Sequence, residues 1–102
     1  MHVISQRHLR TFWQRHAQAE VPLRAWHQIA EHATWKSHAE LLQTYPSADV
    51  IQRLTVFNIG GNDFRLIARV EYERQEIYIR SVLTHAEYHK EDWKNDPWFR
   101  RG

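Results

Sequence analysis

The sequence predicts an α+β domain in which two N-terminal helices pack on one face of a small, mainly antiparallel sheet. The first observation behind this fold class is a series of three runs of β-branched and aromatic residues between Thr55 and Thr84, which is typical of a three-stranded meander. The second is a pair of segments before residue 34 in which apolar residues recur at helical spacing. The third is length, because 102 residues supply one hydrophobic core, so residues 1–102 are expected to form a single domain.

The N-terminal part is expected to form an edge strand and then two helices that pack as an antiparallel pair over the meander. Met1 to Ile4 is short and apolar, and Ser5 is suited to cap a following helix. A second helix is predicted from Val21-Pro22, because proline is tolerated in a first helical turn. The first apolar stripe consists of Leu9, Phe12, Trp13, His16 and Ala17. The second consists of Leu23, Trp26, Ile29, Ala30 and Ala33. Trp13 and Trp26 are expected in the core.

Two segments outside these elements have weaker patterns. Ser37 is suited to cap a short helix through Leu42, which Pro46-Ser47 would end. After Lys90 the chain is polar but contains tryptophans, so a short docked helix and a mobile arm both fit this tail.

Two polar segments, Gly60 to Asp63 and Glu73 to Glu76, are expected to be the hairpin turns of the meander. Because side chains alternate along a strand, each face of the meander has its own set. The apolar face, which the helices are expected to cover, is predicted to hold Thr55, Phe57, Ile59, Phe64, Leu66, Ala68, Val70, Tyr72, Ile77, Ile79, Ser81 and Leu83. The opposite face, expected to be polar and cationic, is predicted to hold Val56, Asn58, Arg65, Ile67, Arg69, Glu71, Tyr78, Arg80, Val82 and Thr84.

Three arginines on the polar face suggest an anion site. A two-residue turn at Arg74 and Gln75 would place Arg69 directly opposite Arg80, and like charges in that position are unfavourable. One interpretation is a solvated face on which Glu71 is the counter-ion of Arg80. The other is that the arginines converge on a phosphate, which a planar guanidinium binds through two hydrogen bonds.

Composition narrows the class of protein without identifying a ligand. Fourteen Lys and Arg against twelve Asp and Glu give a net charge of +2, so nucleic-acid binding would have to depend on local clustering. The mean hydropathy of −0.72 and the absence of a long apolar run argue against a membrane protein. The first residues lack a secretory apolar core, and the absence of cysteine excludes disulfides and thiolate metal sites. A cytoplasmic location is expected.

Two strings of the meander identify a family that the chain resembles. Val-Phe-Asn-Ile-Gly-Gly-Asn at 56–62 and Leu-Thr-His-Ala-Glu-Tyr at 83–88 resemble the HigB-type toxins of bacterial toxin–antitoxin pairs, within the RelE superfamily of messenger-RNA interferases. The likeness extends over essentially the whole chain. It implies a RelE-like fold and a toxin that cleaves messenger RNA on translating ribosomes. It also implies a helix-turn-helix antitoxin of the HigA type, with operator DNA bound only through that antitoxin.

The chemistry implied by the resemblance is cleavage without a metal or another cofactor, in which the ribose 2′-hydroxyl attacks the adjacent phosphate. Such a reaction needs a base, an acid and fixed positive charge. Arg65 matches the arginine that contacts the scissile phosphate in RelE-type toxins, and His85 falls near the position of their acid. The full set of expected catalytic residues is Arg65, His85, Tyr88 and Lys90. The expected RNA-binding residues are Asn58, Arg69 and Arg80. The chain departs from RelE on the first meander strand, where Val56, Phe57 and Asn58 replace lysines, so the base is not identified and Asn58 would only orient the substrate.

Each of these assignments has an alternative. In the structural alternatives, His85 only ends a strand, Tyr88 is a core residue, and Lys90 is an ordinary surface lysine. Arg65 would be structural. At the level of function, the alternatives are a non-catalytic toxin on the same scaffold, such as a ParE-like gyrase inhibitor, and an inactive RNA-binding relative. A zinc site at His85 and His89 is disfavoured, because a zinc-protease helix has glutamate where this chain has Ala86.

Overall fold

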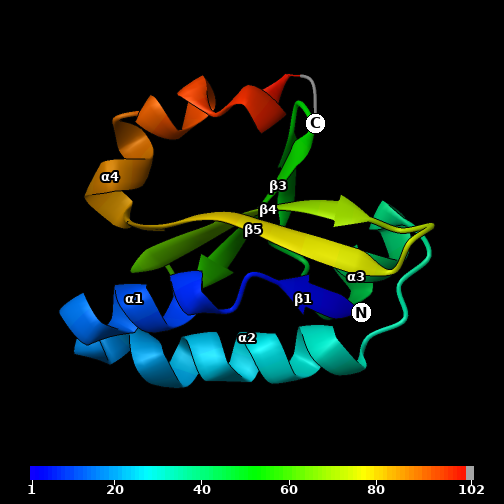
Figure 1. The fold of residues 1–102 in the computed structure, drawn as a ribbon, viewed down its shortest axis with the longest axis horizontal. Coiled ribbons are helices and arrows are strands. Elements are labelled where there is room, and N and C mark those ends of the chain that lie inside the picture. The colour runs from blue at the N-terminus through cyan, green and yellow to red at the C-terminus, as the bar shows by residue number, and fades with distance from the viewer. Residues whose placement is uncertain (101–102) are drawn as a thin grey trace.

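The computed structural model of the chain describes residues 1–100, in which a five-stranded mixed sheet lies between two layers (Figure 1). The strands are β1 (His2–Ile4), β2 (Asp49–Ile51), β3 (Leu54–Ile59), β4 (Phe64–Glu71) and β5 (Glu76–Thr84), in the order β1-β5-β4-β3-β2. The helices are α1 (Arg7–Arg15), α2 (Glu20–His32), α3 (His38–Thr44) and α4 (His85–His89), with short 3₁₀ helices η1 (Ala17–Ala19), η2 (Asp92–Asn95) and η3 (Pro97–Phe99). The α+β prediction is confirmed.

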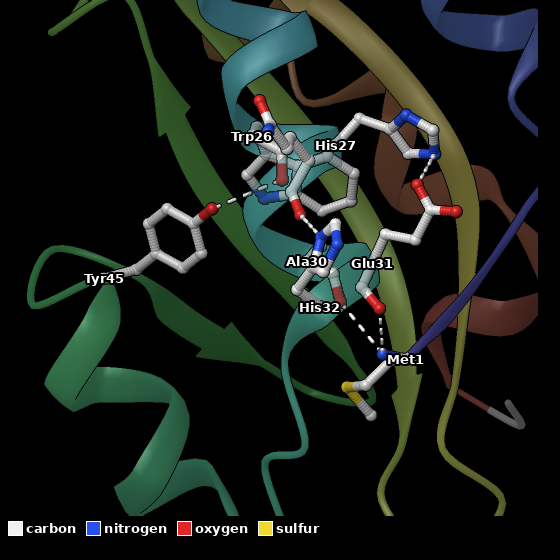
Figure 2. A network of polar contacts seen from close by, with 8 residues as sticks. Met1, Trp26, His27, Ala30, Glu31, His32 and Tyr45 are labelled. Carbon is white, nitrogen blue, oxygen red and sulfur yellow. Dashed lines mark hydrogen bonds and ion pairs between the residues drawn. The ribbon is translucent and has the colours of Figure 1, made fainter.

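The predicted edge strand is also confirmed, and its first residue is bound to a helix. β1 pairs in parallel with β5, which makes the sheet mixed. The amino group of Met1 donates hydrogen bonds to the carbonyl oxygens of Ala30 and Glu31, both at 3.0 Å (Figure 2). It also donates to the carbonyl oxygen of Ala33, at 2.6 Å. Carbonyls at a helix C-terminus lack intrahelical partners and favour positive charge, so this amino group stabilises the end of α2.

The two N-terminal helices cover one face of the sheet, as predicted (Figure 1). Aromatic pairs join this layer to the sheet: Trp26 of α2 and Tyr45, which follows α3, each meet the ring of Phe57 edge to face at 5.3 Å. Phe12 of α1 meets Phe64 at 5.5 Å. Such edge-to-face pairs are favourable arrangements of aromatic rings. The buried members of this core include Phe57, Leu66, Ile79, Phe12 and Trp26, whereas Trp13 and Val70 are half-buried.

The helix boundaries differ from the prediction in detail. The residue that precedes α1 is Gln6, not Ser5, and it makes no side-chain cap. Ile29, predicted on the apolar stripe of α2, is 45% exposed. By contrast, Ser37 caps α3 as predicted, because its hydroxyl accepts a hydrogen bond from the backbone N–H of Glu40.

A β-bulge changes the predicted register of the second hairpin. Ile67 pairs with Ser81 while Ala68 pairs with Ile79, so Arg80 has no partner in the ladder. On the turn side of the bulge, Glu71 pairs with Glu76, so four residues rather than two form the turn and Arg69 lies opposite Tyr78. The predicted pairing of Arg69 with Arg80 is therefore wrong.

The bulge also reverses the faces of β5 beyond it. Val82 packs against the helix-side core, although it was predicted on the polar face. Leu83 packs against the opposite side, although it was predicted on the apolar face. A one-residue shift has this effect because side chains alternate with a period of two.

The face predicted to be a polar platform is in fact covered by the C-terminal segment, residues 91–100 (Figure 1). Trp93 and Phe99 pack there against Val56 and Ile67, and all four side chains are buried. The far end of the segment is tied down because the backbone N–H of Arg53 donates to the carbonyl of Phe99 at 3.2 Å. Of the two alternatives for the tail, a docked helix and a mobile arm, the structure shows a docked segment up to residue 100. Residues 101 and 102 of the predicted tail lie outside the described residues.

Candidate active site

The first hairpin of the meander places one backbone carbonyl at the centre of the candidate site. The turn has four residues between Ile59 and Phe64, and Gly60 and Gly61 both have positive φ, at 61° and 68°. Glycine adopts such angles without steric cost. The turn leaves the carbonyl oxygen of Asn62 free of backbone partners, and it accepts from Arg65 Nη1 at 2.9 Å.

Arg65 is a buried guanidinium whose hydrogen bonds all go to neutral acceptors. Its residue exposure is 7%, and it also donates to the carbonyl of Phe64 at 3.1 Å and to the side-chain oxygen of Asn62 at 3.4 Å. None of these partners carries negative charge, so the positive charge of Arg65 is oriented but not neutralised. An oriented cation of this kind suits an anionic ligand.

His85 contacts the same carbonyl oxygen, that of Asn62. It is the first residue of α4, and its backbone N–H donates to the carbonyl of Asp63 at 3.1 Å. Its ring nitrogen Nδ1 lies 3.2 Å from the carbonyl oxygen of Asn62. Because a carbonyl can only accept, this contact is a hydrogen bond when Nδ1 carries the proton, which leaves Nε2 of the exposed ring free to exchange protons with a ligand.

Tyr88 lies between Arg65 and the C-terminal segment. The guanidinium of Arg65 is 5.3 Å from the centre of its ring, within the range of a cation–π contact. The ring of Trp93 stacks on that of Tyr88 at 5.4 Å with an angle of 9° between the planes. Tyr88 is half-buried, whereas the side chain of Lys90, which follows α4, is exposed.

Of the expected RNA-binding residues, only Asn58 lies beside this group. It is half-buried on β3 and pairs directly with Arg65. Arg69 is four residues further along β4, a distance of about 13 Å at about 3.3 Å per residue. The predicted convergence of the three arginines on one anion is therefore wrong.

Arg69 and Arg80 each have a carboxylate partner. The Nε atom of Arg69 binds Glu71 at 2.7 Å. Arg80 binds both carboxylate oxygens of Asp96, at 2.9 and 3.0 Å, and its guanidinium lies 4.2 Å from the ring centre of Trp98. The interpretation in which Glu71 is the counter-ion of Arg80 is corrected accordingly, because the C-terminal segment brings Asp96 to Arg80 while Glu71 binds Arg69.

Two groups near these arginines have altered acidity. Burial opposes ionisation of Asp96, but the hydrogen bonds from Arg80 and from the backbone N–H of Trp98, with the charge of Arg80, outweigh it and lower the pKa of this carboxyl. Tyr78 donates a hydrogen bond to Glu76 at 2.7 Å, and this bond is the main reason that the pKa of its hydroxyl is raised.

Two residues of the site were not predicted as such. His89 contacts His85 with 4.3 Å between ring centres, and the spacing of four residues on a helix was the available signal. Trp93 had no comparable signal, because only the folded tail brings it to Tyr88. Among residues 1–100 the structure has no group of three or more His, Cys, Asp or Glu side chains arranged to hold a metal ion. Nor does this part of the chain contain a helix with the length and apolar character needed to span a bilayer.

Comparison with known proteins supplies the family. Residues 19–91 match the family described as HigB_toxin, RelE-like toxic component of a toxin-antitoxin system. The chain belongs to the HigB toxin family. The mRNA interferase toxin HigB of Escherichia coli is 36% identical over 91 residues, which cover 86% of this chain and 88% of that protein. An mRNA interferase HigB of Shigella flexneri has the same identity and coverage, and another from Escherichia coli is 22% identical over 88% of this chain and 90% of its own. The HigB family match includes Arg65, His85, Tyr88 and Lys90 but ends before Trp93.

Proposed function

We propose that this HigB-family toxin is a metal-independent endoribonuclease that cleaves messenger RNA and thereby stops translation. The observation that carries the proposal is the pair formed by Arg65 and His85, which contact one carbonyl oxygen, that of Asn62. Within residues 1–100 the first has hydrogen bonds to neutral acceptors and no carboxylate partner, and the second supplies an exposed imidazole nitrogen. The names of the relatives, which are mRNA interferases, support the same substrate.

The reaction is a transfer within the RNA. The ribose 2′-oxygen forms a bond to the adjacent phosphorus and loses its proton to a base, while the bond from phosphorus to the 5′-oxygen of the next nucleotide breaks. The products are a 2′,3′-cyclic phosphate and a free 5′-hydroxyl. Arg65 binds the phosphate and stabilises the charge that gathers on it in the transition state.

The other residues have separate duties in this proposal. His85, protonated on both nitrogens, gives the Nε2 proton to the leaving 5′-oxygen while Nδ1 stays bonded to Asn62. Tyr88 supports Arg65 through its ring, and Lys90 adds positive charge at the exposed end of α4. Asn58 orients the substrate from the neighbouring strand. Arg69 and Arg80 are proposed as outer RNA contacts with a smaller effect, because Glu71 and Asp96 already offset their charges.

The family defines the expected setting of this activity. A toxin of a toxin–antitoxin system has an antitoxin partner, and we propose a helix-turn-helix protein of the HigA type. Operator DNA would be bound only through that antitoxin. We further propose a cytoplasmic toxin that acts on messenger RNA bound to translating ribosomes.

Incubation of the purified toxin with a defined messenger RNA, with and without translating ribosomes, tests the proposal. Cleavage that leaves a cyclic phosphate and a 5′-hydroxyl is the expected result, and mapped sites that follow the reading frame would establish action on ribosomes. Intact RNA under both conditions, together with inhibition of gyrase supercoiling, would instead identify a ParE-like toxin. Binding of RNA with neither activity would identify an inactive relative.

A further inference from the structure

The side chain of Trp93 stacks on Tyr88, whose ring in turn lies near the guanidinium of Arg65 in the candidate active site. The guanidinium of Arg65 lies 5.3 Å from the ring centre of Tyr88, and the ring of Trp93 lies 5.4 Å from it, nearly parallel. Trp93 thus touches a residue of the proposed site without being exposed to RNA, since its own exposure is 7%.

The helix that carries Tyr88 needs such a support. α4 has five residues and none of them is buried. A helix of this length is not stable alone, because nucleation is costly and few hydrogen bonds repay it. Its N-terminus is fixed by a capping box, in which the Thr84 hydroxyl accepts from the backbone N–H of Glu87 at 3.1 Å and the Glu87 carboxylate accepts from that of Thr84 at 2.9 Å.

Its C-terminus is fixed by Trp93. Glu91 has a φ of 64°, in the left-handed region, and this conformation ends the helix and turns the chain back toward the sheet. The indole Nε1 of Trp93 then donates to the carbonyl of Tyr88 at 3.0 Å. The same tryptophan therefore holds both the ring and the backbone of Tyr88.

Trp93 is in turn held by the sheet. It belongs to the buried cluster with Val56 and Ile67, and the ring of Phe99 meets it edge to face at 5.5 Å. A buried and close-packed side chain of this kind cannot move without displacing its neighbours. It thus provides Tyr88 with a fixed surface.

We propose that Trp93 is a positioning residue of this toxin, which sets the plane of the Tyr88 ring and, through it, the direction of the Arg65 guanidinium. The inference depends on the proposed function, because it concerns the same site. It concerns a part of the chain beyond the family match, which ends at residue 91. Small errors in placing a catalytic group are costly, since a displacement of about 1 Å can lower a rate by about 100-fold.

Trp93→Leu tests the proposal, because it removes both the stacking ring and the indole N–H. Its single-turnover cleavage rate should fall by about 10- to 100-fold, while RNA affinity changes by less than about threefold. Trp93→Phe keeps a ring against Tyr88 and should recover most of the rate. Leu41→Ala is the matched control, because it loosens the helix-side core, to which Trp93 and Tyr88 do not belong, and should leave the rate within about threefold of the wild type.

A double-mutant cycle separates positioning from general loosening. If Trp93 acts through Tyr88, Trp93→Leu should change the rate by less than about threefold in a Tyr88→Ala background. An equal loss in both backgrounds, or an equal loss from Leu41→Ala, would overturn the proposal.

A structural measurement decides the same point independently of activity. In NMR spectra, nuclear Overhauser contacts between the Tyr88 ring and the Arg65 side chain should be present in the wild type and absent in Trp93→Leu. Their persistence in Trp93→Leu would overturn the positioning role. A wild-type protein that does not cut RNA would refute the proposed function alone, and the NMR comparison would still decide whether Trp93 positions Tyr88 and Arg65.

Discussion

Arg65 and His85 bind the same acceptor, the carbonyl oxygen of Asn62, at 2.9 and 3.2 Å. One belongs to the start of β4 and the other to the start of α4, so a single turn residue fixes the spacing of two elements that are far apart in the sequence. If Arg65 binds phosphate and His85 transfers a proton, this shared carbonyl sets the distance between the guanidinium and the imidazole.

Arg65 is expected to act on both binding and turnover, because its charge meets a phosphate that is anionic before and during the reaction. Arg65→Lys keeps the charge but loses the fork of parallel N–H groups. We expect it to weaken RNA binding and to lower the cleavage rate by about 10- to 1000-fold. Filter binding and single-turnover cleavage measure the two effects. Arg10→Lys, at an exposed position on α1, is the matched control and should change neither.

His85 is expected to act mainly in proton transfer. His85→Ala should lower the cleavage rate by about 100- to 10,000-fold and leave RNA affinity nearly unchanged. The comparison variant His32→Ala, at an exposed position on α2, should cut at the wild-type rate. EDTA should have no effect on the wild type, since the proposed reaction uses no metal. A folded His85→Ala protein that cuts within about threefold of the wild type would remove this histidine from the mechanism.

The helix-side half of the molecule was predictable because its signals are local. Alternation along the strands and helical spacing before residue 34 identified Phe57, Leu66 and Trp26 as core, and all three are buried. These patterns depend only on the geometry of single elements, which neighbouring segments rarely override.

The structure on the opposite side of the sheet was not predictable, because it depends on two features of the tertiary structure. The bulge opposite Ile67 and Ala68 shifts the register of β5 by one residue, and no turn residue in the sequence indicates the position of this bulge. The C-terminal segment folds back over the sheet and buries Val56 and Ile67, which in the sequence are isolated apolar residues on a face predicted to be polar. For the same reason the sequence suggested Glu71 or a phosphate as the partner of Arg80, although Asp96, sixteen residues later, binds it. The candidate site itself was anticipated through a resemblance, and no sequence pattern predicted the shared carbonyl of Asn62.

Phe57 tests the helix-side core. Its side chain is 1% exposed and meets the rings of Trp26 and Tyr45. Phe57→Ala should lower the free energy of unfolding by about 3 to 5 kcal/mol, because it removes apolar contacts and leaves a cavity. Val21→Ala, at a position that is 78% exposed, should change it by less than about 0.5 kcal/mol. Denaturant unfolding measures both, and a loss of under about 1 kcal/mol for Phe57→Ala would contradict the observed packing.

The ion pair of Arg80 and Asp96 predicts how the docked tail responds to acid. Arg80 and Asp96 are 30% and 12% exposed as side chains, and two charge-assisted hydrogen bonds join them. Because the pKa of Asp96 is lower in the folded protein than in the unfolded chain, its ionised form stabilises the fold. That stabilisation is complete well above about pH 4, the ordinary pKa of an aspartate, and is lost as pH falls through the lower folded-state pKa.

Asp96→Asn should therefore be less stable than the wild type at neutral pH, by about 1 to 3 kcal/mol, since it leaves Arg80 without a charged partner. The difference should begin to shrink as pH falls below about pH 4, where the carboxyl of the unfolded wild-type chain takes up its proton, and should be lost below the lower folded-state pKa. Urea unfolding from pH 7 to pH 3, followed by tryptophan fluorescence, measures this convergence. Asp49→Asn, at an exposed position of β2, is the matched control. A stability difference for Asp96→Asn that stays constant across this range would mean that the charge of Asp96 does not hold the tail, and that Trp93 and Phe99 dock it through apolar contacts alone.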